Sequence, residues 1–158
     1  MEKIAIFVDV QNIYYTVKEG HQGQFDYNLF WKMLIEQNCE IKKAYAYAIN
    51  RNDQKQIQFQ NILRGIGFEV KLKPFISRGD GSSKGDWDVG IAIDMLEECS
   101  HVDRLILLSG DGDFDLLVAK IISKGKQVDV YGVPQLTADS LIKVATNFYP
   151  IDQSLLIK

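Results

Sequence analysis

The sequence predicts an α/β domain built on an open parallel sheet with helices on both faces. Short, continuous apolar runs recur along the chain, as in strands that are buried on both sides of a parallel sheet. Segments with the apolar spacing of helices lie between these runs, which gives an alternation of strands and helices. The runs cover residues 4–8, 44–49, 68–72, 105–108 and 128–131.

Capping residues and glycines place the helices between the strands. Asp26 is the expected N-cap of a helix over residues 26–37, because its carboxylate can accept hydrogen bonds from the first turn. A helix over residues 53–64 is expected to stop at Gly65 and Gly67. Further helices are expected from Asn12 onward and over residues 87–99, 114–124 and 136–146.

The length of the chain fits one domain with a single core. The 158 residues divide into an expected domain at 1–150 and a C-terminal tail at 151–158. Residues 77–85 are rich in glycine, serine and charge, so this segment is expected to be an exposed loop.

Composition limits which binding partners and which cellular compartment are expected for the protein. The net charge of −3 gives no global attraction to nucleic acid or to an anionic membrane, so nucleic-acid binding would need a local patch. Cys39 and Cys99 form no CxxC unit, which argues against a zinc site and suits a reducing compartment. The apolar run at 4–8 is too short for a signal peptide or a membrane span. We expect a cytoplasmic protein without a membrane partner, and a homodimer stays open.

Aspartates follow two of the predicted strands and begin one of the predicted helices. Asp9 closes the first strand, Asp111 and Asp113 follow the fourth, and Asp86 and Asp88 flank Trp87 at the start of the helix at 87–99. Ligands of open parallel sheets bind beyond the carboxyl ends of the strands, where such residues would meet. Ionised carboxylates in one place need a proton or a cation between them, and Mg²⁺ or Mn²⁺ suits hard oxygen ligands. Metal-assisted phosphodiester hydrolysis is the corresponding chemistry.

Structural roles are the alternative for each of these acids. Asp86 could serve as a helix cap, and Asp111 with Asp113 could form a tight turn into a helix. Asp94 points about 120° away from Asp88 around the helix axis, so both cannot face one ion; Asp94 would support the site from behind or lie on the surface.

Other motifs lack key residues. Leu116 and Ile122 occupy the glycine and glutamate positions of a calcium loop, and residues 79–85 lack the GK[ST] order of a phosphate loop. Neither a GxGxxG run after the first strand nor a GxSxG elbow is present.

Substrate contacts are expected from residues that neighbour the acids. Cations mixed with aromatic residues at 71–78, followed by Lys84 and Trp87, could grip a phosphate backbone and stack a base. Tyr14 and Tyr15 could line the same cleft, although core packing is a common fate of tyrosines on a helix. The candidate substrate-binding residues are Asn12, Lys84, Trp87 and Ser109.

Three ordered motifs carry a resemblance that covers nearly the whole chain: FVDVQN at residues 7–12, KGDWDVGIAID at 84–94 and LSGDGDF at 108–114. Together they resemble the NYN domain family, in its bacterial LabA-like branch, which belongs to the PIN-like nuclease group. The resemblance implies a Rossmann-like, PIN-like fold that binds Mg²⁺ or Mn²⁺ and hydrolyses RNA. The implied metal ligands and catalytic acids are Asp9, Asp88, Asp111 and Asp113.

The family pattern Lys-Gly-x-Asp has an extra residue here, so Asp86 and Asp88 compete for one role. Asp88 keeps the family's spacing to Asp94 and is assigned as the ligand, which leaves Asp86 and Asp94 as supporting residues. Asn12 would hold the first acid or the substrate. The hypothesis is a metal-dependent ribonuclease; the alternative is a non-catalytic regulatory module that binds RNA, a nucleotide or a protein through the same cleft.

Overall fold

The fold is built on six parallel strands. The computed structural model describes residues 1–74, 76–77, 83–84 and 86–158, and its main sheet has the strand order β3-β2-β1-β6-β7-β8. The six strands are β1 (Glu2–Asp9), β2 (Cys39–Asn50), β3 (Glu69–Pro74), β6 (Arg104–Leu108), β7 (Gln127–Gly132) and β8 (Asn147–Pro150). The predicted α/β fold with an open parallel sheet is confirmed. The last strand, β8, was not predicted from the sequence.

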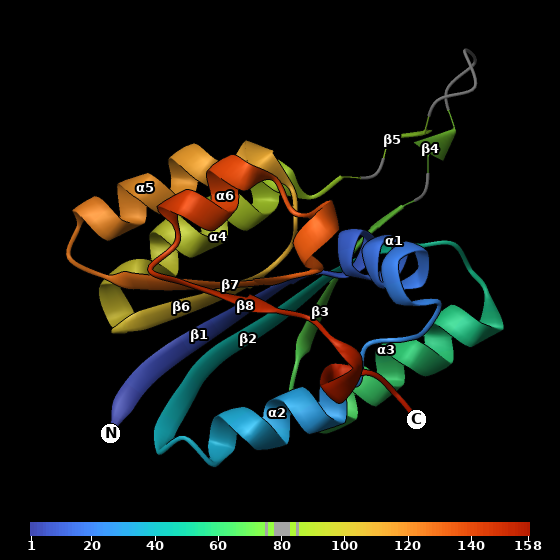
Figure 1. The fold of residues 1–158 in the computed structure, drawn as a ribbon. Coiled ribbons are helices and arrows are strands. Elements are labelled where there is room, and N and C mark those ends of the chain that lie inside the picture. Colours follow the sequence, from blue (N-terminus) through green and yellow to red (C-terminus); the bar gives the residue numbers. More distant parts are fainter. Residues whose placement is uncertain (75, 78–82, 85) are drawn as a thin grey trace.

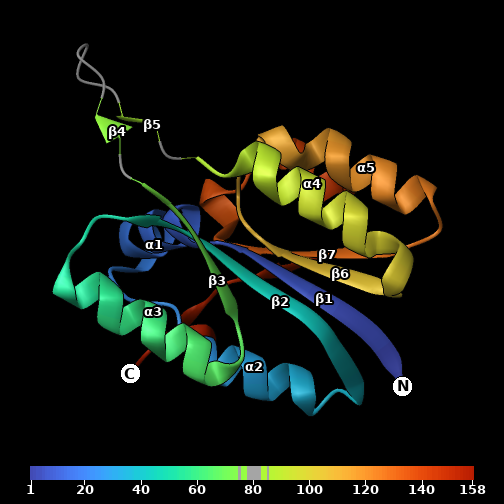
Figure 2. The ribbon, with the colours of Figure 1, turned by 180° about the vertical axis from the view of Figure 1, so that it is seen from behind.

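Helices cover both faces of this sheet (Figures 1 and 2). One face carries α1 (Val10–His21), α2 (Tyr27–Ile35) and α3 (Gln54–Ile66), and the other carries α4 (Asp88–Glu98), α5 (Asp115–Ser123) and α6 (Asp139–Val144). Short 3-10 turns lie at η1 (Cys99–His101), η2 (Gly112–Phe114), η3 (Pro134–Leu136) and η4 (Gln153–Leu155). Within the described residues, no helix is long and apolar enough to cross a bilayer.

Strand β1 shows why its apolar run is continuous. Ile4, Ile6 and Val8 pack into the core under α1 and α2, whereas Ala5 and Phe7 pack into the core under α4 and α5. Successive side chains of a strand point to opposite faces, so a strand that is covered on both sides needs apolar residues at every position.

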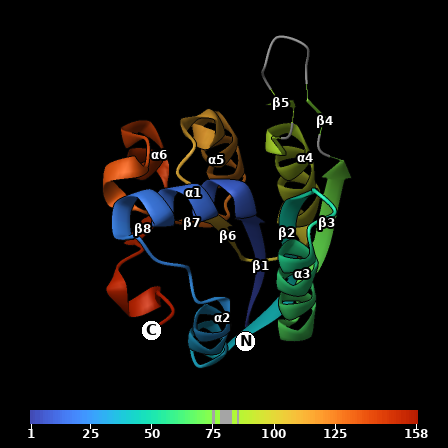
Figure 3. The same ribbon diagram turned by 90° about the vertical axis from the view of Figure 1, so that its right-hand side faces the viewer.

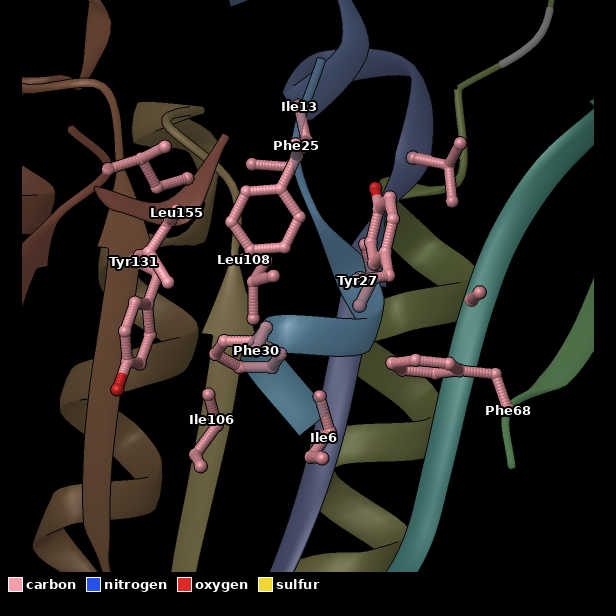
Figure 4. Packing of buried hydrophobic residues seen from close by; sticks show 14 of the residues in the cluster. Ile6, Ile13, Phe25, Tyr27, Phe30, Phe68, Ile106, Leu108, Tyr131 and Leu155 are labelled. Carbon is pink, nitrogen blue, oxygen red and sulfur yellow. The ribbon is translucent and has the colours of Figure 1, made fainter. Parts of the chain in front are cut away.

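The C-terminal residues complete the first of these cores. Leu155 belongs to the same buried cluster as Phe25, Phe30 and Tyr131 (Figure 4), and Ile151 is fully buried in that cluster. The ring centroids of Phe30 and Tyr131 are 5.1 Å apart in an edge-on arrangement. Residues 151–158 therefore contribute apolar surface to the domain.

Two helix boundaries follow the predicted signals. Asp26 accepts a hydrogen bond from the Leu29 backbone N–H at 3.0 Å, as an N-cap does. Helix α3 continues through Gly65, where a stop was also expected, and ends at Ile66 with Gly67 as its C-cap. The φ of +140° at Gly67 lies where side-chain-bearing residues are strained.

The prediction that no helix begins before Asn12 was wrong. Helix α1 begins at Val10, directly after Asp9, because Val10, Ile13 and Val17 have helical spacing and all three are buried against the sheet.

The helix predicted over residues 136–146 was also too long. The chain forms η3 and the short α6, and Ala145 then adopts an extended conformation. The Thr146 backbone N–H donates to the Val128 carbonyl at 2.8 Å, and this bond brings the chain into the sheet as β8.

The predicted exposed loop at 77–85 is described only in part. Residues 76–77 and 83–84 pair as a short antiparallel hairpin of β4 (Ile76–Ser77) and β5 (Ser83–Lys84). Residues 78–82 and 85 lie outside the described residues.

Candidate metal site

The carboxyl ends of the strands form the edge of the sheet that α1 crosses in Figure 3. A cleft of about 240 Å³ opens at this edge, between the start of α1, the start of α4 and the chain that follows β6. The residues that line it are Asp9, Gln11, Asn12, Tyr15, Thr16, Asp86, Asp88 and Asp111.

Three carboxylates meet at this edge. Asp88, Asp111 and Asp113 each place one oxygen within 4.8 Å of the other two. Asp88 and Asp111 are half-buried and Asp113 is exposed. Asp9 is outside this closest group but lines the same cleft, so the structure brings all four predicted acids to one edge of the sheet.

Asp9 lies where β1 passes into α1, yet its carboxylate makes no regular capping hydrogen bond to that helix. Its Oδ2 accepts a hydrogen bond from the Ser109 hydroxyl at 3.2 Å. Burial raises the pKa of Asp9 to about 6, and the negative charges of Asp111 and Asp86 act in the same direction. The side chain is thus poised to bind either a proton or a cation near neutral pH.

The Asp88 carboxyl is also more basic than an ordinary aspartate. Burial raises its pKa to about 7, followed by the charge of Asp111, a hydrogen bond to Asp111, and the charges of Asp86 and Asp9. Asp88 and Asp111 are held close enough for their ionised forms to oppose each other. A divalent cation with hard oxygen ligands relieves this repulsion, so the donor set fits Mg²⁺ or Mn²⁺.

Hydrogen bonds hold the loop that carries Asp111 and Asp113. The Asn12 side-chain oxygen accepts from the Gly110 backbone N–H at 2.9 Å, and the buried Ser109 hydroxyl accepts from the Asp111 N–H at 3.2 Å. Asp111 Oδ1 accepts from the Asp113 N–H at 2.9 Å, as the turn interpretation predicted. Asp111 therefore shapes its own turn and also belongs to the acidic cluster.

The residues before α4 are held more closely to the protein than the sequence suggested. Asp86 is exposed, lines the cleft and accepts from the Asp88 backbone N–H at 3.3 Å, as a capping residue would. The Trp87 indole N–H donates to the Ala48 carbonyl at 2.9 Å. The Trp87 ring also packs against Tyr47, with the ring centroids 5.3 Å apart, and Lys73 Nζ lies 4.5 Å from its centroid, so less of the ring is open for stacking on a base.

Asp94 and Lys84 are two other residues that the sequence assigned to the site. Asp94 accepts hydrogen bonds from the Tyr47 hydroxyl and from Lys71 Nζ, both at 2.7 Å, so it faces β2 and β3. Lys84 lies in β5, and its side chain is outside the described part of the structure.

Sequence reasoning missed Gln11 and Thr16, which line the cleft together with Asn12 and Tyr15. These residues lie on one face of α1, because positions three or four apart on a helix are neighbours. Had the start of this helix been predicted at Val10, the helical spacing of Gln11, Asn12, Tyr15 and Thr16 would have indicated a shared face. Tyr14 is exposed beside Tyr15, with the ring centroids 5.3 Å apart.

The chain is similar to known proteins over nearly its whole length. The family model of the NYN domain matches residues 3–152. The "Low amplitude and bright protein LabA" of Synechococcus elongatus is 27% identical over 154 residues, which cover 93% of this chain and 82% of that protein. A crystal structure of a protein of unknown function from Vibrio parahaemolyticus is 58% identical, with a TM-score of 0.92; the match covers 99% of this chain and 96% of that one.

Proposed function

The chain belongs to the NYN domain family, and from this premise we propose that it is a metal-dependent ribonuclease that hydrolyses RNA phosphodiester bonds at its aspartate cluster. The observation that carries the proposal is the approach of Asp88, Asp111 and Asp113, whose carboxylate oxygens lie within 4.8 Å of one another. Three such oxygens at the carboxyl edge of a parallel sheet form a donor set suited to a small divalent cation.

The four acids Asp9, Asp88, Asp111 and Asp113 would hold Mg²⁺ or Mn²⁺. A divalent ion bound there would supply a Lewis acid that activates water and neutralises charge on a phosphate. The cluster fits that role because burial, and then the neighbouring carboxylates, raise the pKa of Asp88, and a bound cation would offset both effects.

The remaining residues of the cleft would order the site and the substrate. The Ser109 hydroxyl directs its proton toward Asp9 Oδ2, and Asn12 fixes the loop at Gly110. Gln11, Thr16 and Tyr15 supply polar and aromatic groups along the wall that α1 forms. Lys84 and Trp87 stay predicted substrate contacts. The cytoplasmic location and the homodimer also stay predictions.

The acidic cleft makes RNA binding dependent on cations. A phosphate group is repelled by ionised carboxylates, so the substrate should bind only when a divalent ion offsets their charge. The protein's net charge of −3 gives no compensating global attraction.

Cleavage of end-labelled single-stranded RNA with Mn²⁺ or Mg²⁺ tests the proposal. We expect the native protein to cleave, and we expect Asp9→Asn and Asp111→Asn to lose activity while still folding. Asp139→Asn is the matched control, because Asp139 is exposed and pairs only with Lys143 among the described ion pairs. Cleavage that persists in Asp111→Asn would contradict the assignment. Mn²⁺ binding without cleavage by the native protein would favour the regulatory module.

A further inference from the structure

Lys73 in β3 contacts Trp87, the residue before α4, and the proposed chemistry does not use this contact. We propose that Lys73 and Trp87 form a clamp, defined by these two side chains, that positions Asp88 for cation binding. The inference rests on the metal site of the proposed function and assigns Lys73 and Trp87 as positioning residues. It gives Trp87 a role different from the base contact predicted from the sequence.

Trp87 is gripped by elements on both sides. Its indole N–H donates to the Ala48 carbonyl at 2.9 Å, and its ring lies 5.3 Å from the Tyr47 ring, so β2 holds it from one direction. On α4, a Cβ placed on Gly90 would lie only 2.6 Å from Trp87 Cε3. Glycine at position 90 therefore allows the indole to lie directly against the first turn of the helix.

Lys73 closes the clamp from β3, the edge strand. Its Nζ lies 4.5 Å from the centroid of the Trp87 ring and donates to the Asp86 backbone carbonyl at 3.1 Å. One ammonium group thus holds the side chain of Trp87 and the main chain just before it. Lys73 therefore links the end of β3 to the residues that immediately precede α4, two elements that Figure 2 shows.

The clamp acts on the acids because Trp87 stands between Asp86 and Asp88. The Asp88 backbone N–H donates to Asp86 Oδ1 at 3.3 Å, so a movement of residues 86–87 would carry Asp88 with it. The carboxylate oxygens of Asp88 and Asp111 lie within 4.8 Å of each other, so the ionised forms of the two side chains repel. By opposing displacement of Asp88, the clamp lowers the free energy needed to bring the metal-binding carboxylates together.

The charge of Lys73 makes the proposal easy to test. A lysine near a cation site disfavours a second cation through its charge alone, so simple electrostatics predicts that Lys73→Met binds Mn²⁺ more tightly. Positioning predicts the opposite result. If the main role of Lys73 were to hold RNA, Lys73→Met would leave Mn²⁺ affinity unchanged and would lower only the affinity for RNA.

The experiment is calorimetric titration of Mn²⁺ into the protein without RNA. We expect Lys73→Met to weaken Mn²⁺ binding by about 10-fold, in the range typical of groups that support metal ligands. Lys73→Arg should restore most of the affinity, because a guanidinium can also cover the indole and donate to a carbonyl. Lys43→Met removes one exposed cation from β2 and should leave the affinity unchanged.

Trp87→Leu provides an independent variant, which removes both the ring beneath Lys73 and the bond to Ala48. It should weaken Mn²⁺ binding at least as much as Lys73→Met, and thermal melting without metal checks that each variant is folded. Unchanged or tighter Mn²⁺ binding in folded Lys73→Met or Trp87→Leu overturns the clamp. Absence of Mn²⁺ binding by the native protein overturns the metal site itself, which separates the two failures.

Discussion

The side-chain oxygen of Asn12 accepts a 2.9 Å hydrogen bond from the backbone N–H of Gly110. This bond joins the first turn of α1 to the loop that carries Asp111 and Asp113. Two segments far apart in the sequence thereby hold a common position at the carboxyl edge of the sheet. At the same edge, Gly110 packs closely against residues 136–137, and several carboxylates lie together without a neutralising cation from the protein's described side chains.

Removing the Asn12 side chain should destabilise the fold. In Asn12→Ala the partly buried Gly110 N–H loses its acceptor, and we expect the free energy of unfolding to fall by about 1–2 kcal/mol. Urea denaturation measures the change. Asn61→Ala, on the exposed face of α3, is the control and should leave stability unchanged or slightly higher. Equal stability of native protein and Asn12→Ala would show that the bond contributes nothing.

The metal-free protein should lose stability as pH rises toward neutrality. Asp9 and Asp88 have pKa values near 6 and 7 in the folded state, above the ordinary value of 3.8, so the folded state binds their protons more tightly than the unfolded state. Their contribution is complete below the ordinary pKa of 3.8, decreases as pH rises above that value, and is lost above about pH 6 for Asp9 and about pH 7 for Asp88. For Asp9 the loss is about 3 kcal/mol; solvent screening makes that of the more exposed Asp88 smaller.

Urea denaturation at about pH 5 and about pH 8, with a chelator and then with Mn²⁺, checks this dependence. Asp9→Asn should flatten the curve of the metal-free protein, because the amide does not titrate. Mn²⁺ should raise stability more at the higher pH, where the carboxylates are ionised. A metal-free stability that increases from the lower to the higher pH would contradict the argument.

Adding one methyl group at Gly110 should disturb the loop. A Cβ there would lie 2.7 Å from the Leu136 backbone oxygen and 3.1 Å from Thr137 Cα, so backbone would have to move. We expect Gly110→Ala to lower stability by about 1–3 kcal/mol and to weaken Mn²⁺ binding.

Gly65→Ala is the matched control for this substitution. Gly65 lies in α3, and nothing lies within 4 Å of the place that a Cβ would take there, so alanine should raise stability by up to about 1 kcal/mol. Thermal or urea unfolding of both variants measures the contrast. Tolerance of Gly110→Ala without loss of stability would mean that the loop adapts freely.

An ion pair at the opposite end of the sheet should matter more for stability than for the site. Arg104 Nη1 donates to the buried Asp129 at 2.6 Å, and Arg104 Nε donates to Glu2 at 3.2 Å. Arg104→Met leaves the Asp129 charge without its cation and should cost about 3–5 kcal/mol. Lys143→Met breaks the exposed pair with Asp139 and should leave stability almost unchanged. Similar losses in the two variants, measured by urea unfolding, would refute the distinction.

Local sequence determined the layout of the domain. The apolar run at 4–8 fills both faces of β1, so its residues alone predicted a strand covered on two sides. Asp26 and Gly67 act through bonds and backbone angles within one or two turns, which is why they marked helix ends correctly. Strand ends also put Asp9 and Asp111 at one edge, because every parallel strand ends on the same side.

Tertiary structure decided what those local rules leave open. Strand β8 exists because residues 147–150 find a partner in β7, and α1 starts at Val10 because its apolar face meets the sheet. Trp87 is held by Lys73 because β3 lies beside it. Asp94 faces Lys71 and not the metal site for the same kind of reason, since its partner comes from a segment distant in sequence. Spacing along the chain fixes which residues share a face of one element; only the packing of elements against each other fixes their partners.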